Sequence, residues 1–292
     1  MIVRLHLKDS TIELSSTMIM GNIDLNTDAP LSLDDIYDIA EDYKESGATF
    51  LEFSVNKYEQ MDCSVDGQLD MLCAAIEAVN DCELIVGVYT SNPEIMTKVA
   101  QCGAQFIVDP NALRAPGAIE AISSTGLAVC MLYDQQCSFK EEDDSDPCAA
   151  VSEFFYERLD ACMNAGIDRQ KIILEPMIGV HTSVEYRLKI FGRLKTFVSF
   201  GLPLSCSLPR LVANESDSNP NEQNMSIVTT VALFAEQQGI RIIRTKKVYD
   251  IAVAINSWHA LHQSARPFKL TRAIGEKLKN LAHGKRRGNA NK

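Results

Sequence analysis

Short apolar segments alternate along the chain with longer amphipathic segments from about residue 17 onward. The short segments are rich in β-branched residues, as buried strands are. They predict eight strands, at 18–23, 49–54, 83–89, 105–110, 128–133, 171–176, 203–208 and 241–245. The longer segments have apolar residues at helical spacing and predict eight helices, at 32–47, 66–80, 92–103, 115–123, 148–166, 183–201, 224–239 and 248–263.

This alternation predicts a parallel sheet, because strands that are apolar throughout are covered by helices on both faces. Eight strand–helix units close most simply into a (β/α)8 TIM barrel, a fold that suits a chain of 292 residues. A doubly wound open sheet is the alternative, but no GxGxxG follows the first strand. Alternating residues in the segments 2–7 and 10–15 further predict a β-hairpin that plugs the floor of the barrel.

The domain organisation expected from this pattern is one barrel domain, residues 1–265, followed by a basic C-terminal tail, residues 266–292. The tail is either a short helix with a frayed end or an interaction segment. Two long polar loops, at 134–147 and 212–224, follow the fifth and seventh strands. They therefore belong to the catalytic face of a barrel, where they are either solvated surface loops or parts of the site.

The composition limits the cellular compartment and the classes of binding partner that we expect for this protein. The formal net charge of −11 disfavours general binding to nucleic acid or to anionic membranes by the body of the protein. No apolar stretch is long enough to span a membrane, and the N-terminal segment lacks the apolar region of a signal peptide. The nine cysteines are irregularly spaced without a CxxC pair, so we expect a cytoplasmic protein with no disulfide framework.

Polar residues gather at the carboxyl ends of the predicted strands, which is where barrels place their chemistry. Carboxylates follow strands one, two, four and six, and cations follow strands seven and eight. The residues are Asp24, Asn26, Glu52, Tyr89, Asp109, Glu175, Arg210, Arg244 and Lys246. Such a mouth would hold a polar ring on its acidic side and an anion on its basic side. The alternative is that these residues are strand-end caps and ion pairs around the rim.

The order of several segments resembles that of the dihydropteroate synthases and of the wider pterin-binding barrels. The resemblance runs from about residue 17 to residue 263 with order and spacing preserved. The segments are IMGNIDLNTDAPLS (19–32), GATFLEFSVNKY (47–58), IVGVYTSNPEIMTKVAQCGAQFIVDPNAL (85–113), AGIDRQKIILEPMIGVHTSVEYRLKIFGRLKTFVSFGLPL (165–204) and RIIRTKKVYDIAVAINSW (241–258).

The resemblance implies a function in folate metabolism, the condensation of dihydropterin pyrophosphate with p-aminobenzoate to give dihydropteroate and pyrophosphate, assisted by Mg²⁺. It implies pterin-pocket positions at Glu52, Tyr89, Val108, Asp109, Glu175 and Leu211. It implies anion or pyrophosphate positions at Asn26, Arg210, Arg244 and Lys246, and a metal position at Asp24. No catalytic residue is assigned. A homodimer is expected because family members are often dimers.

The chain differs from the family at several of these positions. Glu52 and Glu175 each stand where the family has Asp. Tyr89 stands where the family has an Asp that binds the pterin ring. Val108 stands in place of the family's Asn, and Leu211 in place of its Lys. Two functions therefore stay open, a transferase of the synthase type with an altered pocket and a non-catalytic pseudoenzyme. The latter would bind a pterin or a phosphorylated small molecule, or regulate folate enzymes. Methyl transfer from a folate on the same barrel is a third, less favoured function.

Overall fold

The computed structural model describes residues 3–26, 31–55, 64–133, 146–176, 184–208 and 225–264. The chain divides into two compact units, Met1–Ile255 and Asn256–Lys292. All of the strands in the described ranges belong to the first unit. In the second unit, the rings of Trp258 and His262 lie 4.1 Å apart within one helix. The basic tail lies outside the described residues, so its separation from the barrel at residue 265 stays a prediction.

Eight parallel strands form one sheet in the order β8-β7-β6-β5-β4-β3-β10-β9. A parallel bridge between Leu174 and Leu204 joins the two edges of this sheet, where the Leu174 N–H donates to the Pro203 carbonyl at 2.9 Å. The predicted barrel and all eight of its strands are thus confirmed. The strands are β3 (Met18–Asp24), β4 (Ala48–Ser54), β5 (Ile85–Tyr89), β6 (Phe106–Asp109), β7 (Ala128–Leu132), β8 (Ile172–Glu175), β9 (Ser205–Ser207) and β10 (Ile242–Thr245).

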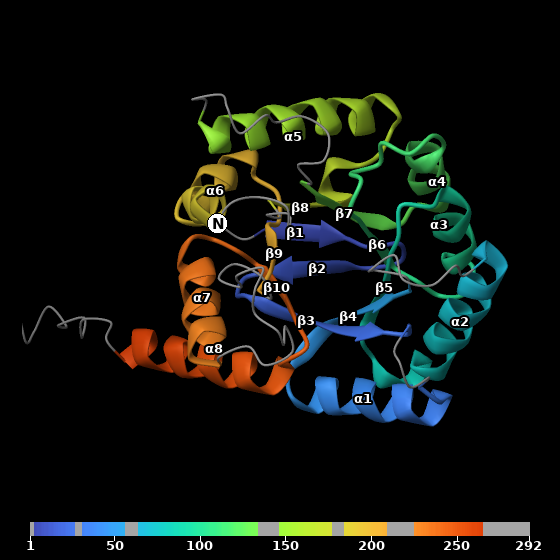
Figure 1. Cartoon of the computed structure of the whole chain (residues 1–292), viewed down its shortest axis with the longest axis horizontal. Coiled ribbons are helices and arrows are strands. Elements are labelled where there is room, and N and C mark those ends of the chain that lie inside the picture. The colour runs from blue at the N-terminus through green and yellow to red at the C-terminus, as the bar shows by residue number, and fades with distance from the viewer. Residues whose placement is uncertain are drawn as a thin grey trace, which may run out of the picture. The chain divides into compact units, whose positions relative to one another are not determined.

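Helices follow the strands and surround the sheet (Figure 1). They are α1 (Leu33–Glu45), α2 (Val65–Ala78), α3 (Pro93–Val99), α4 (Ala118–Thr125), α5 (Pro147–Asn164), α6 (Val184–Phe191), α7 (Met225–Gln237) and α8 (Val248–Ser264). In the described ranges, the 3₁₀ segments η1 (Asn80–Cys82), η3 (Arg169–Lys171) and η4 (Leu194–Phe200) lie between them. Local sequence explains the helix starts: Ser32 and Asp35 form a reciprocal capping box at α1, and Pro93 opens α3 behind the Asn92 cap.

The helix expected at 183–201 is wrong as a single element. Helix α6 ends at Phe191, and the chain continues from Leu194 as the 3₁₀ segment η4. Gly192 lies at the break, and glycine has a low helix propensity. Beyond it the backbone tightens, since the Thr196 N–H donates to the Arg193 carbonyl at 2.9 Å, three residues back.

The sheet separates two apolar cores. The larger core lies outside the strands, between the sheet and the helices, and includes Leu51 and Phe53. The smaller core fills the barrel interior with side chains such as Phe50, Phe106 and Met20. Alternate residues of each strand face the two cores, as period-two alternation requires.

The barrel interior is packed closely at Phe106. Its ring meets that of Phe50 edge-on, with the ring centroids 5.7 Å apart. It also lies directly over Gly87, where an added Cβ would be 2.4 Å from the Phe106 ring. Only glycine fits at position 87, because any side chain would displace this buried aromatic ring.

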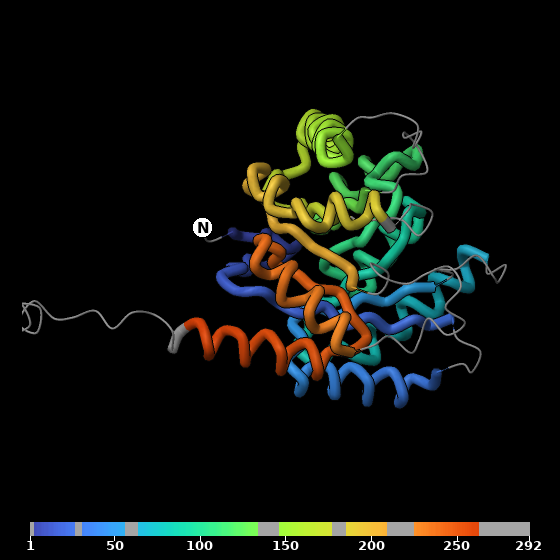
Figure 2. The backbone as a smooth tube through the Cα atoms, turned by 60° about the vertical axis from the view of Figure 1, so that its left-hand side comes forward, coloured from blue at the N-terminus to red at the C-terminus, as the bar shows by residue number. Residues whose placement is uncertain are grey.

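The N-terminal segment forms the predicted hairpin, an antiparallel pair of β1 (Val3–His6) and β2 (Thr11–Leu14). Its leucines, Leu5, Leu7 and Leu14, are buried within the interior core. Its polar side chains contact loops that precede strands: the Lys8 ammonium donates to the Ala100 carbonyl at 3.1 Å, and His6 contacts Asp168 at 2.9 Å. The hairpin therefore closes the amino-terminal end of the strands, the floor of the barrel (Figure 2).

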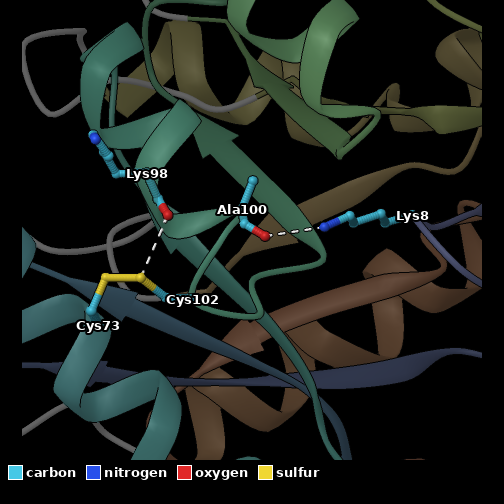
Figure 3. Close-up of a disulfide and its surroundings, with 5 residues drawn as sticks. All are labelled: Lys8, Cys73, Lys98, Ala100 and Cys102. Atoms are coloured by element: carbon cyan, nitrogen blue, oxygen red, sulfur yellow. Dashed lines mark hydrogen bonds between the residues drawn. A yellow bond between two sulfur atoms is a disulfide. The ribbon is translucent and has the colours of Figure 1, made fainter.

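The expectation of no disulfide framework is wrong for one pair of cysteines. Cys73 of α2 is bonded to Cys102, which follows α3, and their Cα atoms lie 5.4 Å apart (Figure 3). The two residues are separated by 29 positions in the sequence. They meet because α2 and α3 pack side by side as successive outer helices, a proximity that spacing alone does not reveal. The other described cysteines are buried thiols, at positions 82, 130, 148, 162 and 206.

None of the helices in the described ranges combines the length and the apolar character that crossing a membrane requires.

Candidate functional site

The polar residues at the barrel mouth come from alternate, inward-facing positions of neighbouring strands. In the register of β3 and β4, Asn22 lies beside Glu52 and Asp24 lies beside Ser54. In the register of β4 and β5, Ser54 lies beside Tyr89. Each strand thus delivers its last inward side chains to the carboxyl end of the barrel, as the sequence predicts.

The centre of the site is an arginine held between two glutamates. Arg244 of β10 donates through Nη1 to Glu52 Oε2, and through Nη2 to Glu175 Oε1 at 2.9 Å. The side chains of Glu52 and Glu175 are fully buried, and that of Arg244 is 3% exposed. A buried ion pair depends on its partners, because removing one partner leaves a buried charge without compensation, at a cost of about 3–5 kcal/mol.

Two further side chains complete this cluster. The Asn22 amide donates to Glu52 Oε1 at 2.7 Å, so both oxygens of that carboxylate are used. The guanidinium carbon of Arg244 lies 5.8 Å from the centre of the Tyr89 ring, a cation–π distance. Burial acts to lower the pKa of Arg244, but Glu175 and Glu52 outweigh it and the pKa is raised well above its ordinary value.

Several buried polar atoms of the same interior are poorly satisfied. Ser54 Oγ and Arg244 Nε are buried and have no hydrogen-bond partner among the described residues. The Cys130 thiol lies 3.9 Å from Glu175 Oε2, and burial, with the Glu175 charge, raises its pKa well above the ordinary value. Unsatisfied buried groups are uncommon in native interiors, so these atoms mark an environment suited to a polar ligand.

Asp109, predicted for the pterin pocket, is engaged elsewhere. It accepts hydrogen bonds from the Ser91 hydroxyl at 2.6 Å and from the backbone N–H groups of Asn111 and Leu113, each at 2.7 Å. Burial raises its pKa, although these bonds oppose the rise. The loop that it holds contains Ala112 and Leu113 with φ of 49° and 59°, left-handed values that non-glycine residues rarely adopt. Val108, its neighbour, faces the apolar interior.

The predicted anion-binding residues within the described ranges lie in different surroundings. Arg244 is paired inside the barrel, whereas Lys246 is exposed beyond the end of β10. The N–H of Asn26 donates to Asp24 Oδ1 at 3.1 Å, at the end of β3. Arg210 and Leu211 lie outside the described residues, as do both long polar loops except for residues 146 and 147.

The metal position implied at Asp24 fits one mode of Mg²⁺ binding. Asp24 is a mostly buried carboxylate with one oxygen used by Asn26. Within the described ranges, no group of three or more His, Cys, Asp or Glu side chains could enclose a metal ion. Mg²⁺ is commonly bound by one or two protein carboxylates, with waters and ligand phosphates as its other ligands. Asp24 fits this kind of site, and it does not fit a site made of protein ligands alone.

The predicted site positions do not include Asn22, Ser54 or Cys130, although Asn22 and Ser54 belong to the polar strand ends that the sequence places at the carboxyl end of the barrel. Asn22 precedes Asp24 by two positions in β3, so strand alternation was a sufficient signal that both face inward. Ser54 follows Glu52 in the same way. Cys130 could not be found by pattern, because it lies within a wholly apolar strand.

A closed (β/α)8 barrel with a buried polar cluster at its carboxyl end is the architecture of a small-molecule site. Comparison with protein families matches residues 26–246 to the family described as pterin binding enzyme. The chain therefore belongs to the pterin-binding enzyme family.

Curated proteins and solved structures agree with this membership. The dihydropteroate synthase of Escherichia coli K12 is 28% identical over 267 residues, covering 87% of this chain and 94% of that protein. A crystal structure of the Yersinia pestis dihydropteroate synthase matches with a TM-score of 0.75 and 26% identity, over 89% of this chain and 99% of that one. The Vibrio fischeri 7,8-dihydropteroate synthase, at 24% identity and a TM-score of 0.81 over 91% of this chain and 100% of that one, supports the fold.

Proposed function

We propose that this chain is a dihydropteroate synthase-like protein of folate metabolism, with a pterin-class ligand site at the carboxyl mouth of its barrel. The family match and the names of the relatives support this proposal. The observation that carries it is the pair of buried carboxylates, Glu52 and Glu175, which Arg244 bridges with its guanidinium 5.8 Å from the centre of the Tyr89 ring. Carboxylates accept hydrogen bonds from ring N–H groups, and an aromatic side chain packs against a planar ring.

The condensation implied by the family also needs charge stabilisation for the departing pyrophosphate. Asp24 would hold Mg²⁺ together with the ligand phosphates, and the ion would stabilise the negative charge that develops on the leaving group. Lys246 and Asn26, at the ends of β10 and β3, are the described groups that would contact the phosphates. Arg210 and Leu211 remain predicted positions, for the anion and for the pterin edge respectively.

Ligand binding is the first test of this proposal. Thermal unfolding of the purified chain is measured with 6-hydroxymethylpterin, with p-aminobenzoate and with pyrophosphate plus Mg²⁺. A ligand that binds the folded state raises the midpoint by mass action. A rise that depends on pterin concentration supports the proposal. An unchanged midpoint up to millimolar pterin contradicts it.

A second candidate, a paralogue that binds ligand without turnover, is favoured by one specific observation. Arg244 is already paired with both carboxylates, so its positive charge partly compensates their two negative charges inside the chain. Formation of dihydropteroate from dihydropterin pyrophosphate and p-aminobenzoate with Mg²⁺ separates the two candidates. Product formation, or rescue of a synthase-deficient cell, establishes the transferase. Pterin binding without product in either assay establishes the binding or regulatory role.

The compartment and the assembly are further proposals. We propose a cytoplasmic protein that forms a homodimer and does not bind nucleic acid or membranes. Support for the assembly comes from the resemblance, and support for the absence of these partners comes from the acidic net charge of −11. Light scattering coupled to gel filtration tests the dimer, which is contradicted by a monomer mass at micromolar concentration.

A further inference from the structure

The carboxylate pair at the barrel mouth is already occupied by side chains of this protein. Of its four oxygens, Glu52 Oε2 and Glu175 Oε1 accept from the Arg244 guanidinium, and Glu52 Oε1 accepts from Asn22. In the described part of the chain, the partner of the remaining oxygen, Glu175 Oε2, is the weak Cys130 thiol at 3.9 Å. A ligand that needs these carboxylates therefore meets a competitor within the chain.

The competitor and a pterin-class ligand have the same chemistry. A guanidinium presents adjacent N–H donors in one plane, which match the two oxygens of a carboxylate. The edge of a 2-amino-4-oxopyrimidine ring, as in pterins and guanine, also presents adjacent N–H donors in one plane. Both groups pack against aromatic rings, and Tyr89 already lies over the Arg244 guanidinium at 5.8 Å. Arg244 donates one N–H to Glu175, so a ring that donates to both oxygens of Glu175 would have to displace that bond.

The internal pairing is also incomplete. Arg244 Nε is buried without a hydrogen-bond partner in the described part of the chain, and so is the hydroxyl of Ser54. A buried donor left unpaired is unfavourable, so the arginine does not satisfy this buried polar cluster fully. A ring with polar atoms along its edge can meet such groups where a fixed arginine does not.

We infer that Arg244 is an internal occupant of the ligand site: its guanidinium fills the carboxylate-lined position that a 2-amino-4-oxopyrimidine ring takes on binding. Ligand binding then requires exchange of the ring for the guanidinium, which lowers the affinity of the native chain. This inference rests on the proposed function. It adds that the site binds the edge of the ring that carries the adjacent N–H donors. It also separates Arg244 from the anion-holding role that the resemblance implies.

The test compares ring affinity with and without the internal occupant. Titration calorimetry with 6-hydroxymethylpterin is performed on the native chain and on Arg244→Met, which keeps an unbranched side chain and removes the donors. Arg244→Met alone removes the arginine partner of two buried carboxylates and makes the cluster more negative. A second variant therefore combines Arg244→Met with Glu52→Gln, which keeps the net charge of the cluster at its native value. Arg4→Met, an exposed arginine of the hairpin, is the matched control.

The expected result is an affinity at least tenfold tighter in the folded Arg244 variant than in the native chain, with Arg4→Met unchanged. An affinity that is equal or weaker in the Arg244 variants, while the native chain binds, overturns this inference and leaves the proposed function intact. No binding by the native chain or by any variant overturns the proposed function itself, and this inference with it.

Discussion

The floor and the mouth of the barrel interior differ in chemistry, although the same strands build both. At the floor the inward side chains are apolar, and the hairpin leucines pack against them. At the mouth several of them are amide, hydroxyl or charged groups, although Val108 and Leu132 are apolar. In four strands this change takes a single step of two residues, from Met20 to Asn22, from Phe50 to Glu52, from Ile173 to Glu175 and from Ile242 to Arg244.

The difference shows how one sheet can separate stability from binding. Apolar burial at the floor is non-directional and stabilises the barrel whatever ligand is present. The buried charges at the mouth cost desolvation and add little net stability as a set, although each depends strongly on its partners. We therefore expect floor substitutions to change stability, and mouth substitutions to change ligand binding as well.

The largest effect is expected at the floor, for Phe106→Ala. This ring is fully buried against Phe50 and over Gly87, so its removal leaves a cavity that the backbone cannot close. The free energy of unfolding is expected to fall by about 3–5 kcal/mol in chemical denaturation. Phe106→Leu is the control and should lose less. A loss below about 1 kcal/mol for the alanine variant would show that the floor does not stabilise the barrel.

The next largest effect is expected beside the floor, at the disulfide. Cys102→Ser opens the link between α2 and the end of α3, close to the Lys8 contact of the hairpin. Unfolding stability is expected to fall by about 3 kcal/mol, because the link restricts the unfolded chain. A reductant should lower the midpoint of the native chain and leave that of the variant unchanged. Equal sensitivity of the two proteins to the reductant would contradict the prediction.

A smaller loss of stability is expected at the mouth, for Asn22→Ala. The change leaves Glu52 Oε1 buried without its donor, which costs about 1–3 kcal/mol in the free energy of unfolding. Chemical denaturation measures this loss, with the exposed Asn80→Ala as the matched control. A result within error of that control would show that Asn22 does not support the carboxylate.

The smallest effect is expected at a floor ion pair and depends on pH. A bond from the Gln170 N–H, with a lesser contribution from His6, lowers the pKa of Asp168 from its ordinary value of 3.8. A lowered folded-state pKa stabilises the protein above the unfolded value, and this stability is lost as pH falls through the folded value. Asp168→Asn should therefore flatten the stability curve below about pH 4. The pH dependence is measured by thermal unfolding. If the midpoint of Asp168→Asn falls as steeply at acid pH as that of the native chain, the prediction is wrong.

Strand alternation and capping residues were sufficient to predict the barrel, its eight strands and the floor hairpin. They also placed Glu52, Glu175 and Arg244 at the carboxyl ends of their strands. The sequence could not show that these three side chains pair with one another, because their separations along the chain are large and the contact depends on closure of the barrel. The Cys73–Cys102 bond was missed for the same reason, since helix packing alone brings the two residues together.

The loop after β6 shows a different limit of sequence reasoning. Asp109 follows an apolar strand as a site carboxylate would, yet both of its oxygens hold the backbone of residues 111 and 113. Strand alternation places Asp109 on the face of β6 opposite to the inward Phe106 and Val108, but it does not show that the carboxylate caps the following turn. Its role in a pterin pocket therefore stays a prediction.

The most direct test of a ligand site at the mouth is the affinity of Glu175→Gln for 6-hydroxymethylpterin, measured by titration calorimetry. The substitution keeps the size of the side chain and removes the charge that accepts ring N–H donors. Binding is expected to weaken by about tenfold to a hundredfold relative to the native chain. Glu13→Gln, on the exposed face of the hairpin, should bind as the native chain does. Unchanged affinity in Glu175→Gln would contradict the assignment of the mouth as the pterin site.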